Sequence, residues 1–183
     1  MVTLTKGQKV DLRKEAPELK RVLVGLGWDP VRGFFSMDID ASVICIDEKG
    51  KMDKLVYFGN TKAYSKAIKH YGDNLTGKGD GDDEQIEINL NKLPQKIRRL
   101  SIIINIFAAS IKRQHFGKVN NCYVHVTDLD GRELIRYDID GNFNNMTGIF
   151  VADIYRDNNG WTFKAIGEGC RGNIDDMIDM KCK

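Results

Sequence analysis

The stretch Ser101-Ile102-Ile103-Ile104-Asn105-Ile106-Phe107 decides the fold class, because it is apolar and β-branched almost throughout. Such a run is typical of a strand that is buried on both faces, so we expect it at the centre of a sheet. Around it lie shorter segments in which apolar and polar residues alternate, the pattern of a strand with one buried face. These segments cover 20–28, 35–46, 55–58, 85–90, 122–127, 133–137, 149–155 and 161–166.

Turn residues separate the alternating segments. Asp128-Leu129-Asp130-Gly131 lies between two of them and predicts a β-hairpin. Asp157-Asn158-Asn159-Gly160 predicts a second hairpin in the same way. Hairpins join neighbouring antiparallel strands, so the sheets are expected to be largely antiparallel.

Helix signals are few. Residues 110–114 predict a single helical turn, and 173–180 predict a C-terminal helix that Asn173 caps. Residues 61–69 are open to strand, loop or helix. Many short strands with turns between them predict a mostly β chain, folded as an antiparallel β-sandwich with a few short helices. Its length of 183 residues suits one domain spanning residues 1–183.

Bulk composition narrows the function classes. The net charge of +2 favours neither nucleic acid nor an anionic membrane as a partner. The four cysteines include no CxxC pair, which argues against a zinc ribbon or a thioredoxin-like site. No signal-peptide pattern opens the sequence and no long uncharged apolar stretch follows, so we expect a soluble, reduced cytoplasmic protein.

Carboxylates and glycines crowd residues 71–85. The acidic residues there are Asp73, Asp80, Asp82, Asp83 and Glu84, and Lys78 is the only base. Glycines allow backbone oxygens and short carboxylates to converge on one point. Two carboxylates about 4 Å apart repel by roughly 4 kcal/mol at an effective dielectric of ~20, so they must point into water or share a cation.

The kind of ligand atom favours Ca²⁺. This ion accepts several oxygen ligands in irregular geometry, whereas Mg²⁺ demands a regular octahedron. Zinc and copper prefer histidine or cysteine, and residues 71–85 contain neither. The spacing is not that of an EF-hand. The alternative is a solvated acidic loop, because aspartate and glycine are common in turns.

A second acidic pair lies on a predicted strand. Asp38 and Asp40 are two residues apart, so both project from one face, which continues with Ser42 and two isoleucines. Like charges at the head of a core-like face are unfavourable unless they are paired, and this predicts a second part of the metal site. Asp29 joins the set as a third candidate. The alternative is a solvated strand end.

Several elements taken in order resemble one family. They are Val2-Thr3-Leu4-Thr5-Lys6-Gly7, Leu23-Val24-Gly25-Leu26-Gly27-Trp28-Asp29, Met37-Asp38-Ile39-Asp40-Ala41-Ser42, Phe116-Gly117-Lys118-Val119, Arg136-Tyr137-Asp138, Tyr155-Arg156, Trp161-Thr162-Phe163-Lys164-Ala165-Ile166-Gly167 and the most specific string, Gly72-Asp73-Asn74-Leu75-Thr76-Gly77-Lys78-Gly79-Asp80-Gly81-Asp82-Asp83-Glu84. On these elements the chain resembles the TerD family, bacterial stress-response and tellurite-resistance proteins. The resemblance covers nearly the whole chain.

The resemblance implies a β-sandwich that binds two Ca²⁺ ions in adjoining acidic loops, and a role in resistance to tellurite and other chemical, phage or envelope stress. Its metal-site residues carry over to Asp38, Asp40, Asp73, Asn74, Asp80, Asp82, Asp83 and Glu84, with Asp29 as the weakest transfer. Asp80 falls at a position that varies in the family. The tail after Gly169 also departs from the family pattern.

These observations predict a non-enzymatic, Ca²⁺-dependent interaction module that binds other stress-response proteins. No nucleic-acid partner and no small-molecule substrate are expected. One alternative is a Ca²⁺-bridged membrane adaptor at the inner face of the membrane, with Phe34 and Phe35 beside the loops. Another is a metal-dependent hydrolase, since bound metal can activate water.

Three further features are interpreted as structural. His70, His115 and His125 are scattered, and no serine or cysteine nucleophile is evident beside them in the sequence. Gly25-Leu26-Gly27 lacks the third glycine of a dinucleotide site and suggests close strand packing or a carbonyl ligand. The basic run 96–99 is expected on a solvated edge. The alternative is that this run, with Lys112, Arg113 and Lys118, binds an oxyanion or the acidic patch of a partner.

Overall fold

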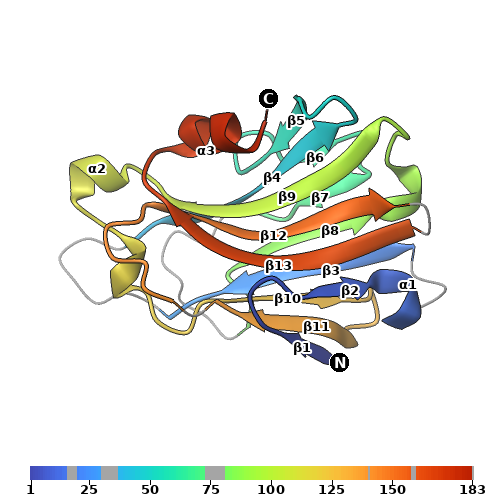
Figure 1. The fold of residues 1–183 in the computed structure, drawn as a ribbon, viewed down its shortest axis with the longest axis horizontal. Coiled ribbons are helices and arrows are strands. Elements are labelled where there is room, and N and C mark those ends of the chain that lie inside the picture. Colours follow the sequence, from blue (N-terminus) through green and yellow to red (C-terminus); the bar gives the residue numbers. More distant parts are fainter. Residues whose placement is uncertain (16–19, 30–36, 73–80, 140, 158–159, 183) are drawn as a thin grey trace.

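The computed structural model describes residues 1–15, 20–29, 37–72, 81–139, 141–157 and 160–182. Its strands form two sheets that pack face to face (Figure 1). In spatial order the first sheet contains β1 (Val2–Leu4), β11 (Glu133–Asp138), β10 (Tyr123–Thr127), β3 (Arg21–Gly27), β8 (Glu84–Asn89), β7 (Ile68–His70) and β6 (Lys62–Ala63). The second contains β2 (Lys9–Asp11), β13 (Gly160–Cys170), β12 (Gly148–Asp157), β9 (Ile97–Ile106), β4 (Ile39–Asp47) and β5 (Met52–Val56).

The predicted β-sandwich is confirmed. β9 contains most of the β-branched run and lies between β12 and β4, as expected for a central strand. Both predicted hairpins form, since β10 pairs with β11 and β12 with β13. Parallel pairing occurs between β1 and β11, and the other paired strands of the described chain are antiparallel.

Short helices complete the described part of the chain. They are α1 (Leu12–Glu15), α2 (Ala109–Lys112), α3 (Ile174–Lys181) and the 3-10 turns η1 (Leu90–Lys92) and η2 (Phe116–Lys118). Asn173 caps α3 as predicted, by accepting hydrogen bonds from the backbone of Asp175 and Asp176. The side chain of Asp176 returns a bond to the backbone of Asn173, which completes a capping box.

The alternation along β4 explains why this strand is buried on both faces. Ile39, Ala41 and Val43 enter the main core between the sheets. Ile44 and Ile46 face outward, where they pack with Met177 of α3 in a second, smaller cluster. Figure 1 shows α3 lying over the outer face of the second sheet. The C-terminal tail, which departs from the family pattern in sequence, is therefore docked on the sandwich.

Residues 61–69, which the sequence left open, form β6, a tight turn and the start of β7. Tyr64, Ser65 and Lys66 all have positive φ angles, of 50°, 51° and 69°. The turn contains no glycine, so its left-handed backbone conformation could not be predicted from the residue types that usually mark such turns. Tyr64 anchors it through a 2.7 Å hydrogen bond from its hydroxyl to Asp53 Oδ2.

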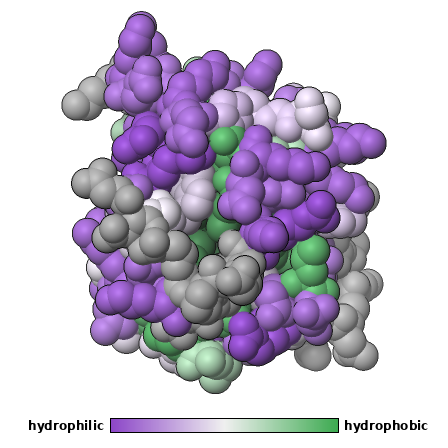
Figure 2. Space-filling view, turned by 90° about the vertical axis from the view of Figure 1, so that its right-hand side faces the viewer, coloured by the Kyte–Doolittle hydropathy of each residue, from purple (hydrophilic) through white to green (hydrophobic). Residues whose placement is uncertain are grey.

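The basic run 96–99 lies at the start of β9, which is an inner strand, so the expected edge position is wrong. Lys96 forms an ion pair with Asp53. Figure 2 views the sandwich from the right-hand side of Figure 1, where hydrophilic side chains dominate and apolar ones show in narrow areas between them. Within the described ranges, no helix is both long and apolar enough to cross a membrane.

Candidate metal centre

One end of the sandwich gathers the predicted acidic elements. β3 pairs antiparallel with β8, and Leu26 lies opposite Glu84. The chain therefore leaves β3 toward Asp29 at the same end where Asp83 leads into β8. Two hydrogen bonds fix this junction: Asp83 N donates to Leu26 O at 2.8 Å, and Trp28 N donates to Asp83 Oδ2 at 2.9 Å.

The start of β4, which contains Asp40, lies at the same end of the sandwich but in the other sheet. The pairing of β4 with β5 begins at Val43, so the backbone of Ala41 lies beyond the partner strand. The side chains of Glu84 and His70 occupy that place. Ala41 N donates to Glu84 Oε2 at 3.3 Å, and His70 Nε2 lies 3.1 Å from Ala41 O. We call this arrangement the Ala41 clasp.

The hydrogen bonds of the clasp define the protonation of His70. Gly72 N donates to Nδ1 at 3.2 Å, so Nδ1 carries a lone pair and the ring proton is on Nε2. That proton points to Glu84 Oε2, 2.9 Å away, and to Ala41 O. Both side chains are at most 1% exposed. The clasp is thus a buried polar link between the two sheets.

Asp82 is held by a separate cluster on the outer face of the first sheet. His125 Nε2 lies 2.9 Å from its carboxylate oxygens, Tyr123 donates to Oδ1 at 3.1 Å and Gln85 donates to Oδ2 at 3.1 Å. Burial alone would raise the pKa of Asp82, but these bonds and the charge of His125 outweigh burial and lower it. His125 Nδ1 lies 2.9 Å from Glu133 Oε2.

Two glycines of β3 make room for this cluster. Gly25 lies directly between His125 and Gln85 in register, and a Cβ there would collide with both Asp82 Oδ2 and His125 Nε2. A Cβ at Gly27 would collide with the ring of Tyr123. Of the two interpretations left open for this pair of glycines, close packing is therefore the one that the geometry supports.

Some of these carboxylates have a third kind of environment. From the sequence, the carboxylates were expected either to point into water or to share a cation. Asp82 and Glu84 instead accept hydrogen bonds from protein groups. Asp83 differs, since burial raises the pKa of its carboxyl and the negative charges of Asp82 and Asp29 raise it further, against the bond from Trp28.

Asp40 projects from the outer face of β4, where it is only 3% exposed, so the solvated strand end is wrong for this residue. Its cross-strand partner is Asn105 of β9, and directly opposed residues share a face of the sheet about 4.5–5.5 Å apart. Ser42 lies two residues further along the same face. Asn105 Oδ1 and Ser42 Oγ are buried and have no hydrogen-bond partner among the described residues.

Asp38 is half-buried just before β4, and its carbonyl oxygen accepts a hydrogen bond from Phe107 N. Asp73, Asn74 and Asp80 lie outside the described residues. Within the described part of the chain, no three histidine, cysteine, aspartate or glutamate side chains are grouped closely enough to hold a metal. A complete site would therefore need oxygen atoms of other kinds, or ligands from residues 73–80.

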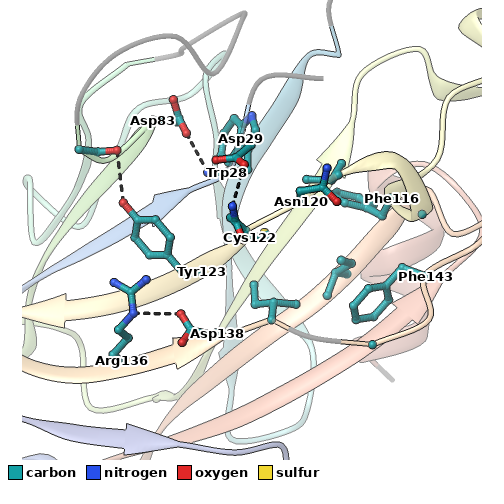
Figure 3. A pocket seen from close by; sticks show the side chains of 17 residues that line it. Trp28, Asp29, Asp83, Phe116, Asn120, Cys122, Tyr123, Arg136, Asp138 and Phe143 are labelled. Carbon is teal, nitrogen blue, oxygen red and sulfur yellow. Dashed lines mark hydrogen bonds and ion pairs between the residues drawn. The ribbon is translucent and has the colours of Figure 1, made fainter. Parts of the chain in front are cut away.

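A cavity of about 890 Å³ opens beside this end of the sandwich (Figure 3). Asp29 and Asp83 lie on its wall, together with Trp28. Arg136 stacks on the ring of Tyr123 at 4.3 Å and binds Asp138 Oδ1 at 2.9 Å. The cavity thus combines aromatic surface with carboxylates, of which Asp29 is exposed and accepts a hydrogen bond from Asn121 Nδ2 at 2.7 Å.

Comparison with known proteins confirms the resemblance seen in the sequence. A family model described as the TerD domain matches residues 1–180. The chain belongs to the TerD family. Its relatives carry names from tellurium resistance and the stress response.

Two TerD-family relatives match almost end to end. Stress response protein SCP2 of Bacillus subtilis (strain 168) is 40% identical over 193 residues, which is 97% of this chain and 97% of the relative. Tellurium resistance protein TerZ of Serratia marcescens is 40% identical over 188 residues, covering 97% and 95%. A solved structure of a TerD homologue from Streptomyces coelicolor A3(2) has a TM-score of 0.72 at 25% identity, covering 87% of this chain and 95% of that one.

Sequence reasoning missed the partners of the TerD-domain carboxylates. It set His70 and His125 aside, yet these residues hold Glu84 and Asp82. It also read Asn105 only as part of an apolar strand. One signal was available: Gly25 and Gly27 leave the outward side of β3 bare, which indicates that other groups pack over it.

Replacing His125 by glutamine is expected to lower the free energy of unfolding by about 1–3 kcal/mol where the ion pairs are charged. The raised pKa of His125 makes its contribution complete below pH 6.5 and lost as pH rises through the folded-state value. The lowered pKa of Asp82 makes its contribution complete above pH 3.8 and lost as pH falls. The loss should therefore peak between pH 3.8 and 6.5.

Urea unfolding of both proteins in chelator, repeated across this pH range, measures the effect. His115→Gln is the control for replacing a histidine, because His115 lies outside the cluster. A flat difference for His125→Gln would contradict the assignment of these ion pairs.

Proposed function

We propose that this TerD-family chain is a non-enzymatic Ca²⁺-binding module of the tellurium-resistance and stress response. One observation carries the proposal: buried Asp40 faces Asn105, whose Oδ1 finds no hydrogen-bond donor among the described residues. A buried carboxylate beside acceptor oxygens is unfavourable in a protein interior unless a positive group joins them.

The donor set suits a hard cation. Carboxylate, amide, hydroxyl and carbonyl oxygens are the ligands that Ca²⁺ takes, and the ion tolerates irregular geometry. Asp38 and Asp40, with Asn105 and Ser42, would hold one ion. Cys122 lies on the wall of the cavity that Asp83 also lines, but burial raises the pKa of its thiol to about 12, which disfavours a soft-metal thiolate site there.

A second ion is proposed at Asp83 and Asp29, completed by residues 73–80. Burial raises the pKa of the Asp83 carboxyl, and the negative charges of Asp82 and Asp29 raise it further, so a cation would be favoured there. Asp82 and Glu84 are assigned a supporting role, because a histidine side chain, His125 and His70 respectively, already faces each of these carboxylates. When bound, the ions would neutralise these carboxylates and rigidify this end of the sandwich.

The arrangement favours binding over catalysis. His70 and His125 each have both ring nitrogens engaged in hydrogen bonds, so neither is poised as a general base. The cavity beside Asp29 and Asp83 gives the oxygen atoms of a protein partner access to this end of the molecule. We propose that such a partner belongs to the same stress response.

Thermal melting tests the proposal. Calcium at about 100 times its Kd should stabilise the fold by roughly 2.7 kcal/mol, which corresponds to a rise in Tm of about 5–10 °C at this chain length. Magnesium should do less, and Asp40→Asn should remove much of the calcium effect. Asp179→Asn, on the exposed face of α3, is the control that should respond like the wild type. No calcium-specific rise in Tm, together with no heat of binding in calorimetry, would refute the proposal.

A further inference from the structure

An apolar tip projects from the end of the sandwich at α2. It consists of Phe58, Phe107 and Ile111, with the bases Lys112 and Arg113, and we call it the α2 tip. Phe58 is 44% exposed, Phe107 50% and Ile111 85%. Figure 1 shows α2 at the extreme left end of the long axis, standing clear of the strands. Large apolar side chains gathered in this way on a surface usually mark a contact site.

The two aromatic side chains of the tip contact each other although they come from distant parts of the chain. The rings of Phe58 and Phe107 meet edge to face, with centroids 6.3 Å apart. Tyr57 stacks on the other side of Phe58 at 5.3 Å. Lys112 Nζ lies 5.6 Å from the centre of the Phe107 ring, so its aliphatic stem runs beside apolar surface.

The backbone holds this arrangement in place. Ala108 and Arg113, on either side of α2, both adopt the left-handed conformation, with φ of 54° and 51°. Neither is a glycine, so both positions are unfavourable locally and must be stabilised by their surroundings. The single helical turn between them leaves the side chain of Ile111 exposed to solvent.

The charged side chains of the tip itself are basic. Lys112 and Arg113 follow Ile111 directly, and Lys112 Nζ lies over the ring of Phe107. Two acidic residues adjoin the tip: Asp38, whose carbonyl oxygen accepts a hydrogen bond from Phe107 N, and Asp40, which lies opposite Asn105. A basic and apolar surface is complementary to a negatively charged layer with an apolar interior.

We propose that the α2 tip inserts into an anionic lipid surface. Exposed aromatic and aliphatic groups enter the boundary between headgroups and acyl chains, while Lys112 and Arg113 remain at the phosphates. A projection suits a fluid interface, because it needs no matching groove. The insertion itself uses no bound calcium, so vesicle binding in the presence of chelator separates it from the proposed metal function. Phe34 and Phe35, expected at such a surface, lie outside the described residues.

Vesicle sedimentation of the full chain tests the proposal. With chelator present, the wild type should pellet with vesicles of phosphatidylcholine containing about 30% phosphatidylserine, and less with phosphatidylcholine alone. Phe107→Ser combined with Ile111→Ser should lower the partition coefficient into vesicles about tenfold or more, because two apolar side chains that would enter the lipid are removed. Leu129→Ser is the matched control, because Leu129 is 54% exposed in the β10–β11 turn, away from the tip.

A second measurement does not depend on the double variant remaining folded. Ile111→Trp changes one residue that is 85% exposed, and phosphatidylcholine brominated on its acyl chains should quench the new tryptophan in anionic vesicles. Absence of quenching, or equal pelleting of wild type and double variant, would overturn the proposal. So would loss of self-association in the double variant without any vesicle binding by the wild type, which would make the tip a contact between copies.

Discussion

Replacing His70 by alanine is expected to lower the free energy of unfolding by about 3–5 kcal/mol. This is the usual cost of removing one side chain of a buried pair and leaving the charge of the other, here Glu84, without its partner. His70 and Glu84 are almost completely buried, and His70 Nε2 lies 2.9 Å from Glu84 Oε2. The substitution also removes the donor that faces Ala41 O, at a place where β5 does not reach. Urea or thermal unfolding measures the loss.

A double-mutant cycle with Glu84→Gln separates the charge from the packing. Glutamine keeps an acceptor for Ala41 N but carries no charge, so His70→Ala should cost clearly less in that background. His115→Ala is the control for removing a half-buried imidazole elsewhere. A loss below about 1 kcal/mol for His70→Ala, or equal losses in the two backgrounds, would show that the clasp is not an electrostatic link.

Replacing Gly25 by alanine is expected to cost about 3 kcal/mol or more, which is large for the addition of one methyl group. The new Cβ would occupy the space in which Asp82 meets His125, on a strand held by neighbours on both sides. Either the carboxylate leaves His125 or the backbone of β3 shifts, and both disturb the start of β8. Equilibrium unfolding at a pH near 6, where the ion pair is charged, is the measurement.

The matched background removes the group that the methyl would meet. In a chain that carries Asp82→Ala and His125→Ala, Gly25→Ala should cost less than about 1 kcal/mol, because only ordinary packing remains. A similar loss of stability in both backgrounds would show that the substitution disturbs β3 itself and that the collision with Asp82 and His125 is not the cause.

His70 and Gly25 lie beside the segments that carry the proposed calcium ligands and are not proposed ligands themselves. The Ala41 clasp joins β4 of one sheet to β7 and β8 of the other, and so sets Asp40 in relation to Asp83. The Asp82 cluster fixes the turn into β8 against β10 and β3. If the chain binds calcium as proposed, both substitutions should weaken that binding as well as stability.

The sequence by itself determined the fold class. The β-branched run of β9 predicted a central strand, and the turn residues 128–131 predicted the β10–β11 hairpin, because both signals depend on local geometry and on side-chain alternation. The same local rules predicted the cap of α3 at Asn173. The family also followed from sequence, since its motifs are continuous stretches of chain.

Only the tertiary structure decided which groups face the carboxylates. Glu84 meets His70 and Ala41, Asp82 meets His125, and Asp40 meets Asn105, with partners between 14 and 65 positions apart in the printed sequence. No periodic pattern links residues so distant, because their contact depends on strand order, on register and on the packing of one sheet against the other. The sequence therefore determined that carboxylates crowd this end of the sandwich, and the assembled sheets decided which of them are already held by the protein.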